Sequence, residues 1–361
     1  MFVTDGSFLQ DEIALPQSTN LDAAAKLLAQ GQLVAFPTET VYGLGADALN
    51  EVALQRLFTA KGRPADHPVI VHLAKQSQLP QWAVEIPDRA WRLAEAFWPG
   101  PLTLILKRAA HVPLAVTGGQ DTVGLRVPNH PLALALLEAF GSGVAAPSAN
   151  RFGKLSPTTA QAVLEQLGER VHCVLDGGPC SVGIESTIVA FSATQEVRVL
   201  RPGGISLAQL ADVLQCPVEC LAYPPTAAQQ QAEPRVSGSL PSHYAPEASV
   251  YLLTPQEIEQ ALLQRRTHPQ ASDGKTVAIL SYSLPTPADL PSGVLWQTMP
   301  ANPKDYARWL YHRLRLLDLS GVGCIWVESV PMDRTSAWQG VADRLGRAAA
   351  AARPLLSNPS G

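Results

Sequence analysis

The sequence predicts an α/β protein with two domains. The chain has 361 residues, more than one hydrophobic core usually organises. Helical and strand patterns alternate along both parts of the chain, as is typical of α/β folds. Between these parts lies a stretch rich in Pro, Ala, Gln and Ser with few periodic apolar residues, which indicates a linker. We therefore expect domains at residues 1–215 and 249–361, joined by a linker at 216–248.

The first domain is expected to be built on a strand-rich sheet. It opens with the helical pattern LDAAAKLLA, which stops before Gly31, and with the apolar run LVAF, which leads into a polar loop. Similar patterns recur to about residue 215. Further helices are expected at 51–62, 87–98, 131–141 and 158–168, and strands at 68–74, 102–108, 123–128, 144–150, 171–178, 186–192 and 197–203.

The second domain is expected to be smaller, mostly parallel and Rossmann-like. Its four apolar strands alternate with helical patterns, and parallel strands need such crossovers. The strands are expected at 249–254, 276–282, 294–299 and 324–330, and the helices at 255–266, 302–319 and 338–352. Core packing explains these patterns, and no polar constellation there matches the one in the first domain. We hypothesise that this domain anchors the linker as a lid over the functional site.

Composition narrows the classes of function. Charged residues make up 16% of the chain and the net charge is −4, so a general DNA-binding or membrane-surface protein is disfavoured, although a local basic patch would still allow RNA contact. The first residues carry acids rather than a basic leader, and no apolar run reaches the roughly 18 residues that span a bilayer. We expect a cytoplasmic protein. Its five cysteines are expected to be reduced thiols, because the pair Cys216 and Cys220 lacks a second pair of zinc ligands.

Polar residues gather in the first domain, in loops after predicted strands, where open α/β sheets place ligands. The loop PTETVYGLG (37–45) combines hydroxyls, a carboxylate and a phenol with glycines that let a ligand approach the backbone. A turn capped by threonine explains this loop equally well. Downstream, Lys61 and Arg63 form a cationic pair, held by Pro64 and Pro68, that suits phosphate oxygens better than a solvated turn. His72 follows in an apolar strand, where a satisfied core histidine is the plain alternative.

Further polar clusters follow the same pattern. Thr122 and Arg126 are four residues apart on a strand and share a face, so Arg126 either clamps a carboxylate in a cleft or reaches solvent. In the small-residue segment AAPSAN (145–150) and just beyond it, Ser148, Asn150 and Ser156 offer neutral donors beside an accessible backbone. Segments 183–187 and 200–203 add two more clusters. The common phosphate-loop, dinucleotide-binding, zinc-protease and nucleophile-elbow motifs are absent, so no common ATP motif or hydrolase triad is supported.

Together and in this order, the clusters resemble the YrdC-type threonylcarbamoyl-AMP synthases, in the long form with a C-terminal domain. The resemblance rests on PTETVYGLG, on K-x-R-P with V-x-H downstream, and on LRVP, APSAN, ESTIV and RPG, across about residues 20 to 205. SHYAP (242–246) is similar to the linker motif of the long form, and GVADRLGRAA (340–349) resembles the end of its C-terminal domain. The resemblance implies a YrdC-like twisted open sheet with a cavity, followed by the smaller Rossmann-like domain.

The family resemblance also implies an activity. ATP, L-threonine and bicarbonate would meet in the cavity and yield L-threonylcarbamoyladenylate, pyrophosphate and water, for modification of the adenosine next to the tRNA anticodon. The threonylcarbamate carboxylate would attack the α-phosphorus, so the enzyme would be a nucleotidyltransferase. Mg²⁺ would accompany ATP, with no metal held tightly by protein ligands. A downstream threonylcarbamoyl-transfer complex would take the product, tRNA would be a further partner, and no membrane would be involved.

Site residues carry over from the family position by position. Lys61 and Arg63 would be the catalytic cations. The ATP side would consist of Lys61, Arg63, His67, Thr122, Ser148, Asn150, Ser156, Arg201 and His243. The L-threonine side would consist of Thr40, His72, Arg126, Ala146 and Ser186, with Arg126 taking the carboxylate. His243 and Tyr244 of the linker would close over the cavity.

Two other functions remain open on the sequence. A double-stranded RNA-binding or ribosome-assembly protein would use one positive cavity, formed by Lys61, Arg63, Arg126, Lys154 and Arg201. A carbamoyl transferase with a similar module would carry additional zinc-finger and acylphosphatase-like parts, and the chain has no C-x2-C series. Threonine-dependent turnover of ATP separates both from the adenylate-forming enzyme.

Overall fold

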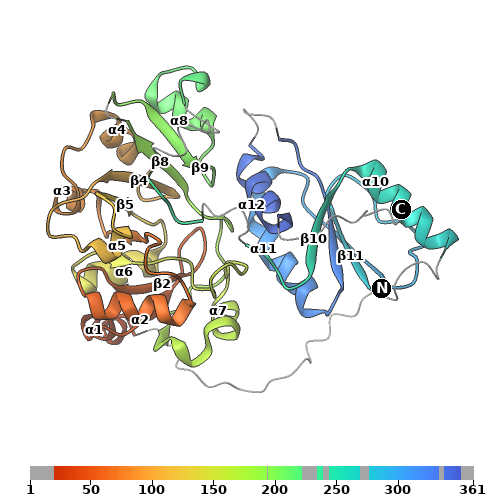
Figure 1. The fold of residues 1–361 in the computed structure, drawn as a ribbon, viewed down its shortest axis with the longest axis horizontal. Coiled ribbons are helices and arrows are strands. Elements are labelled where there is room, and N and C mark those ends of the chain that lie inside the picture. The colour runs from red at the N-terminus through yellow and green to blue at the C-terminus, as the bar shows by residue number, and fades with distance from the viewer. Residues whose placement is uncertain are drawn as a thin grey trace, which may run out of the picture.

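The expected pair of α/β domains is confirmed. The computed structural model describes residues 20–192, 194–221, 234–238, 244–268, 276–332 and 337–350. A nine-stranded sheet forms the first domain and a four-stranded sheet the second, and Figure 1 shows the two side by side. Within the described part of the chain, no helix is both long and apolar enough to cross a membrane.

The large sheet is mixed. Its strands are β1 (Val34–Phe36), β2 (Gly43–Asp47), β3 (Ile70–His72), β4 (Leu102–Lys107), β5 (Thr122–Arg126), β6 (Val144–Ala145), β7 (Cys173–Val174), β8 (Thr187–Phe191) and β9 (Val197–Arg201). Their order is β7-β1-β2-β6-β3-β5-β4-β8-β9, in which β7 and β1, β3 and β5, and β4 and β8 are the parallel pairs. Strands β3 and β5 therefore lie next to each other in the middle, which places His72 directly opposite Arg126.

Strand β2 was not expected from the sequence. The polar loop 37–42 does not lead into a helix but turns back into β2, which pairs antiparallel with β1 and β6. The sequence GLGAD has no β-branched or aromatic residue, so it gives no strand signal. Packing requires its small residues: a Cβ at Gly45 would lie 2.9 Å from side-chain atoms of both Phe36 and Val144.

Helices cover the sheet of the first domain. They are α1 (Leu21–Ala29), α2 (Glu51–Lys61), α3 (Leu79–Trp82), α4 (Asp88–Phe97), α5 (Leu114–Thr117), α6 (Pro131–Phe140), α7 (Ala160–Leu167) and α8 (Leu207–Leu214), with 3-10 turns at Gln76–Gln78, Gly168–Arg170 and Val218–Cys220. Helix α8 was also not expected, although its signal is readable: Ser206 and Gln209 form a capping box, and Leu207, Leu210 and Leu214 are buried in the first-domain core.

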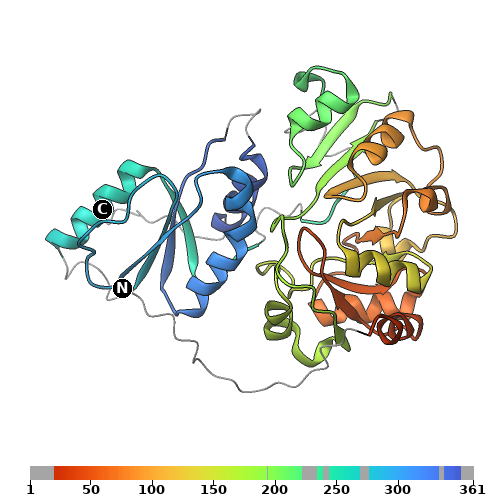
Figure 2. The same ribbon diagram turned by 180° about the vertical axis from the view of Figure 1, so that it is seen from behind.

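The second domain has the expected parallel sheet. Its strands β10 (Ser249–Leu253), β11 (Val277–Ser281), β12 (Val294–Thr298) and β13 (Cys324–Glu328) pair only in parallel, in the order β10-β13-β11-β12. Helices α11 (Pro303–Leu319) and α12 (Gln339–Ala349) lie between this sheet and the first domain, and α10 (Pro255–Thr267) covers the opposite face (Figures 1 and 2).

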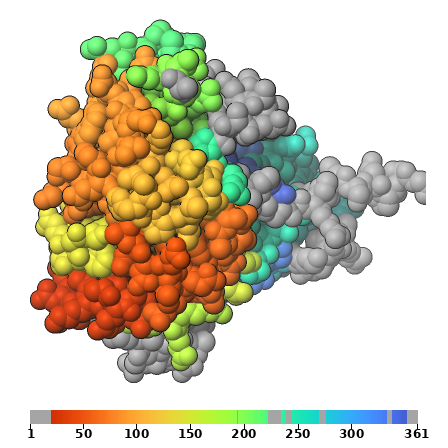
Figure 3. Space-filling model, turned by 60° about the vertical axis from the view of Figure 1, so that its left-hand side comes forward, coloured from red at the N-terminus to blue at the C-terminus, as the bar shows by residue number. Residues whose placement is uncertain are grey.

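The two domains approach each other closely at glycines. A Cβ at Gly183 would lie 2.4 Å from the Cα of Arg308 in α11, and a Cβ at Gly340 in α12 would lie 2.7 Å from the side chain of Ile184. Such distances leave room only for hydrogen on the glycine Cα. In Figure 3 the second domain, in cyan and blue, is partly visible behind the first.

The close approach at Gly183 predicts a position-specific loss of stability. Replacing Gly183 (φ 81°) by alanine adds both backbone strain and a clash with α11, whereas replacing Gly141 (φ 77°) adds only the strain, because nothing lies within 4 Å of its Cβ position. We expect Gly183→Ala to lower the free energy of unfolding by about 1–3 kcal/mol more than Gly141→Ala, measured by denaturant titration. Equal losses would show that the domains adjust without cost at this contact.

Candidate functional site

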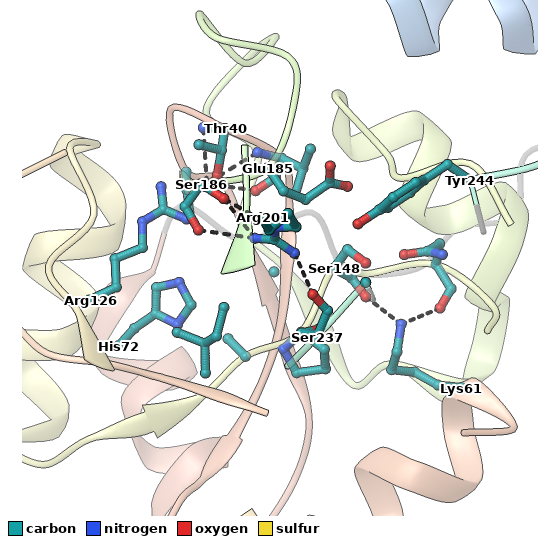
Figure 4. Close-up of a pocket in the computed structure, with 18 of the residues that line it drawn as sticks. Thr40, Lys61, His72, Arg126, Ser148, Glu185, Ser186, Arg201, Ser237 and Tyr244 are labelled. Carbon is teal, nitrogen blue, oxygen red and sulfur yellow. Dashed lines mark hydrogen bonds between the residues drawn. The ribbon is translucent and has the colours of Figure 1, made fainter. Parts of the chain in front are cut away.

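A pocket in the first domain gathers most of the residues expected from the sequence. It lies where loops of the large sheet meet linker residues Ser237, Gly238 and Tyr244. The predicted residues that line it are Thr40, Lys61, Arg63, His72, Arg126, Ala146, Ser148, Asn150, Ser186 and Arg201. Figure 4 shows His72 and Arg126 on one side, Lys61 and Tyr244 on the other, and Arg201 between them.

Three predicted residues lie outside this lining, and a fourth falls outside the described residues. His67 packs its ring against Phe152, at 5.4 Å between centroids; Phe152 lines the pocket and His67 does not. Thr122 starts the strand that Arg126 ends, about 13 Å away at ~3.3 Å per residue. Ser156 donates its hydroxyl to Glu185 Oε1 at 2.5 Å. His243 is not among the described residues.

The end of helix α2 delivers one cation to the pocket. The helix begins at Asn50, whose side chain accepts from two backbone N–H groups, and ends at Lys61, because Gly62 adopts a left-handed conformation (φ 63°). Lys61 is buried, and its Nζ donates to the carbonyl oxygens of Ser148 and Asn150, both at 2.5 Å. Burial, reinforced by the charge of Arg63, holds the Lys61 pKa well below its usual range.

Two arginines complete a cationic half of the pocket. Arg63 Nη2 donates to the carbonyl of Pro68 at 2.7 Å, while its Nε has no partner among the described residues. Burial lowers the Arg63 pKa to about 10. Arg201, at the end of β9, donates through Nε and Nη2 to the carbonyl of Ser186 and through Nη1 to that of Ser237. Burial also lowers the pKa of Arg201.

These three cations share an unusual electrostatic situation. Lys61, Arg63 and Arg201 are 3–7% exposed, and within the described ranges none of them forms an ion pair with a carboxylate. Burying a cation without a counter-charge is costly, and carbonyl oxygens repay only part of that cost. The arrangement therefore suits a polyanion with several oxygens to place among the three groups.

The other half of the pocket has balanced charge. Arg126 donates through Nη2 to Glu39 Oε1 at 2.7 Å and through Nε to the carbonyl of Gly100, which leaves Nη1 for a ligand carboxylate. Thr38 and Thr40 exchange a hydroxyl hydrogen bond of 2.8 Å beside this pair. The half thus combines a fixed guanidinium with hydroxyls, a set of groups that suits a small polar zwitterion such as an amino acid.

His72 is buried in the pocket wall next to Arg126. Its Nδ1 forms no hydrogen bond of normal geometry within the described residues, and a weaker interaction with the Ile70 backbone acts to raise its pKa. Burial, followed by the charge of Arg126, lowers the His72 pKa to about 3, so the ring is neutral near pH 7. A neutral imidazole can bind a hydroxyl or amino group of a ligand.

Two buried carboxylates were not singled out from the sequence. Glu39 pairs with Arg126 and also accepts from the backbone N–H of Asn129, so it orients that guanidinium. Glu185 lines the pocket but directs its carboxylate toward the second domain. Both lie within motifs quoted above, PTETVYGLG and ESTIV. The sequence feature that could have identified these two residues is a glutamate within a segment of otherwise small or apolar residues.

Linker residues cover the pocket. Val236 packs on an apolar patch of the sheet with Ile70, Ile105 and Ile188. Nearby, a Cβ at Gly238 would lie 2.1 Å from the Tyr244 hydroxyl oxygen, so the two described ends of the linker touch above the cations. The expectation of a covering linker stays a prediction for residues 222–233 and 239–243, which lie outside the described ranges.

Comparisons with known proteins give matches over both domains. Residues 26–203 match a Sua5, YciO and YrdC family model described as "Telomere recombination", and residues 205–350 match "Threonylcarbamoyl-AMP synthase, C-terminal domain". The threonylcarbamoyl-AMP synthase of Pyrococcus abyssi is 40% identical over 311 residues, 85% of this chain and 88% of that protein. The Bacillus subtilis protein of the same name is 39% identical and covers 90% and 92%.

A shorter relative and a solved structure extend these matches. A putative threonylcarbamoyl-AMP synthase of Mycobacterium tuberculosis is 39% identical over 198 residues, which span 90% of that protein but 55% of this chain. The crystal structure of P. abyssi Sua5 complexed with L-threonine superposes with a TM-score of 0.79 and 37% identity, covering 91% of this chain and 94% of that one.

The low pKa of His72 predicts a pH-dependent stability. The unfolded ring titrates near 6.5 and the folded ring at about 3, so between these values unfolding takes up a proton and the free energy of unfolding falls as pH falls. For His72→Gln we expect the free energy of unfolding to change less steeply with pH in this window than for wild type, by up to about 1.4 kcal/mol per pH unit. Denaturant titrations at several pH values measure this slope. His268→Gln, at an exposed position, is the control; identical slopes for wild type and His72→Gln would contradict the assignment.

Proposed function

The chain belongs to the threonylcarbamoyl-AMP synthase family, and we propose that it joins L-threonine, bicarbonate and ATP into L-threonylcarbamoyladenylate with release of pyrophosphate and water. The observation that carries this proposal is the charge of the pocket. Three buried cations without carboxylate partners among the described residues lie beside a balanced half that suits an amino acid. A nucleoside triphosphate supplies the missing negative charge, and L-threonine fits the other half.

The two halves receive separate roles. On the nucleotide side, Lys61, Arg63 and Arg201 bind phosphate oxygens, with Ser148 and Asn150 beside them. Asn150 Oδ1 is buried and has no partner among the described residues, so it can accept a hydrogen bond from the nucleotide. On the amino-acid side, Arg126 takes the carboxylate of threonine, and Thr40, His72, Ala146 and Ser186 surround the rest of the molecule.

The chemistry needs positioning and charge stabilisation rather than a protein nucleophile. Carboxylation of the threonine amine creates a carbamate, whose oxygen attacks the α-phosphorus, and pyrophosphate leaves with its electron pair. Negative charge concentrates on the phosphates during this transfer, where Lys61 and Arg63 already lie. Because neither cation is neutralised by a protein carboxylate among the described residues, its full field acts on the transferring group.

A metal ion would be held mainly by the nucleotide. Among the described residues there is no group of three or more His, Cys, Asp or Glu side chains that could hold one. The pocket carboxylate Glu185 is saturated by protein donors and therefore does not fit a direct metal ligand. We propose that Mg²⁺ enters bound to ATP, where it neutralises phosphate charge, and that the protein contributes cations instead.

The wider context of the reaction follows from the same proposal. The adenylate product would pass to a threonylcarbamoyl-transfer complex that modifies tRNA, in the cytoplasm. The chain would divide into a catalytic domain (1–215), a covering linker (216–248) and a C-terminal domain (249–361). His67, Thr122, Ser156 and His243 remain proposed nucleotide-site residues, and the first three would need a rearrangement or an intermediary residue to act on the ligand.

The geometry favours this enzyme over an RNA-binding protein. Four of the five cations considered for RNA contact, Lys61, Arg63, Arg126 and Arg201, lie inside the pocket with 3–7% exposure. The fifth, Lys154, pairs with Glu247. Duplex RNA is contacted across an open surface, which buried side chains cannot provide.

Release of pyrophosphate from ATP tests the proposed function. With Mg²⁺ and bicarbonate present, we expect release that requires L-threonine and is weaker with L-serine. Lys61→Ala should lower kcat/KM at least about 100-fold, because it removes a cation at the transferring phosphate. Arg126→Lys should chiefly raise KM for threonine, about tenfold or more, because lysine cannot form the planar pair.

The control is Lys107→Ala, which removes an exposed lysine paired with Glu85 far from the pocket and should leave the rate unchanged. Release that ignores L-threonine, or a Lys61→Ala variant with normal activity, would reject the proposed function. In that case binding of duplex RNA, measured on the same preparations, becomes the next test.

A further inference from the structure

Glu185 is a pocket residue whose charge is held from the other domain. It is 6% exposed and lines the pocket, yet its Oε2 accepts from Arg344 Nε of α12 at 2.6 Å and from the hydroxyl of Tyr311 of α11 at 2.9 Å. Its Oε1 accepts from Ser156 of the first domain. Three hydrogen bonds from two domains thus converge on one buried carboxylate.

Arg344 is held in this contact by burial and by several further interactions. Its side chain is fully buried, which is rare for arginine, and its Nη1 donates to the carbonyl of Pro202 at 2.9 Å and to Asp343 at 2.6 Å. Its guanidinium carbon also lies 5.2 Å from the ring centroid of Tyr244, which lines the pocket from the linker. Arg344 therefore contacts the first domain, the linker and its own helix at once.

The contact lies one residue from the nucleotide half of the pocket. Ser186 follows Glu185 directly, and both its carbonyl and its hydroxyl accept from Arg201. On the other side, Pro202 follows Arg201 directly and accepts from Arg344. Arg344 thus contacts both segments, 185–186 and 201–202, that orient the Arg201 guanidinium in the pocket. Figure 4 shows Glu185 and Ser186 of the first segment beside Arg201.

We propose that Arg344 and Tyr311 of the second domain are positioning residues for the nucleotide half of the site, acting through ionised Glu185. This inference rests on the proposed function. It assigns the second domain a direct part in binding ATP, so the site is complete only when α11 and α12 are docked. The residues act on Ser186 and Arg201 and do not themselves touch substrate.

The ion pair between Glu185 and Arg344 affects the charge balance of the pocket as well as the packing of the two domains. Burial alone raises the pKa of Glu185, but the charges of Arg344 and Arg201 outweigh burial and lower it to about 2. Without Arg344, Glu185 would have to be neutralised by the nearest remaining cation or by a proton. Arg201 is the pocket cation whose charge also lowers the Glu185 pKa, so loss of Arg344 would draw Arg201 toward Glu185 and away from a phosphate.

The test compares two interdomain ion pairs in the full chain. Arg344→Met breaks the pair with Glu185, and the control Arg315→Met breaks the pair between α11 and Glu165 of α7, which does not reach the pocket. We expect Arg344→Met to weaken binding of MgATP, measured by calorimetry without threonine, about tenfold more than Arg315→Met. Its KM for ATP should rise, and Arg344→Lys should restore part of the loss.

A double variant separates positioning from stability. Removing one partner of a buried pair destabilises a protein more than removing both. Glu185→Gln with Arg344→Met should therefore recover much of the thermal stability lost in Arg344→Met but only part of the MgATP binding, because Arg201 is no longer drawn to residue 185 while segments 185–186 and 201–202 are still not held. Complete recovery of binding together with stability would overturn the proposal, as would equal MgATP binding by Arg344→Met and Arg315→Met.

These measurements distinguish failure of the positioning role from failure of the proposed reaction. Binding of MgATP to the wild-type protein requires no threonine chemistry. If the wild type binds MgATP but releases no pyrophosphate with threonine, the proposed reaction fails and the comparison of variants still decides the positioning role. If pyrophosphate is released and both methionine variants bind MgATP alike, the reaction stands and the positioning role fails.

Discussion

The burial of more positive than negative charge at one pocket is the constraint on which the rest of the structure depends. Lys61, Arg63 and Arg201 are removed from water, and the depressed pKa of each reflects that loss of solvation. Backbone carbonyl oxygens replace part of the water that these cations lose on burial. Lys61 ends α2, where the helix dipole favours a cation, and it takes two carbonyls from the segment that follows β6. A site built this way is stable enough to fold and still lacks the negative charge that its ligand brings.

The fold of the first domain brings segments that are distant in sequence together at the pocket. The adjacent strands β3 and β5 set His72 beside Arg126, and the turn between β1 and β2 adds Glu39 and Thr40 from a segment far away in sequence. The small residues of β2 make this geometry possible, since a side chain at Gly45 would push β1 and β6 apart. The carboxylates are distributed unevenly as a result. Glu39 pairs with Arg126, and Glu185 accepts hydrogen bonds from Tyr311 and Arg344 of the second domain.

Much of this could be predicted from the sequence, and the failures have physical reasons. Apolar periodicity located the helices α2 and α11, which bury one face, and continuous apolar runs located the central parallel strands β11 and β13, which are buried along almost their whole length. Strand β2 escaped prediction because close packing there requires glycine, which carries no strand signal. Ten of the residues that line the pocket were named from sequence motifs and the family resemblance that they carry. The engagement of Ser156 with Glu185 could not be predicted, since a hydroxyl close in sequence to a site does not reveal which way it points.

The network around Glu185 bears on the relation between long and short relatives. The M. tuberculosis relative aligns over nearly its full length but over just over half of this chain, so related proteins exist with far less sequence than two domains require. In the present chain, however, the first domain contains a buried carboxylate whose closest guanidinium partner, Arg344, comes from α12. The charge balance of the first domain in this chain therefore involves the second domain, which supplies Arg344 and Tyr311 to the Glu185 carboxylate.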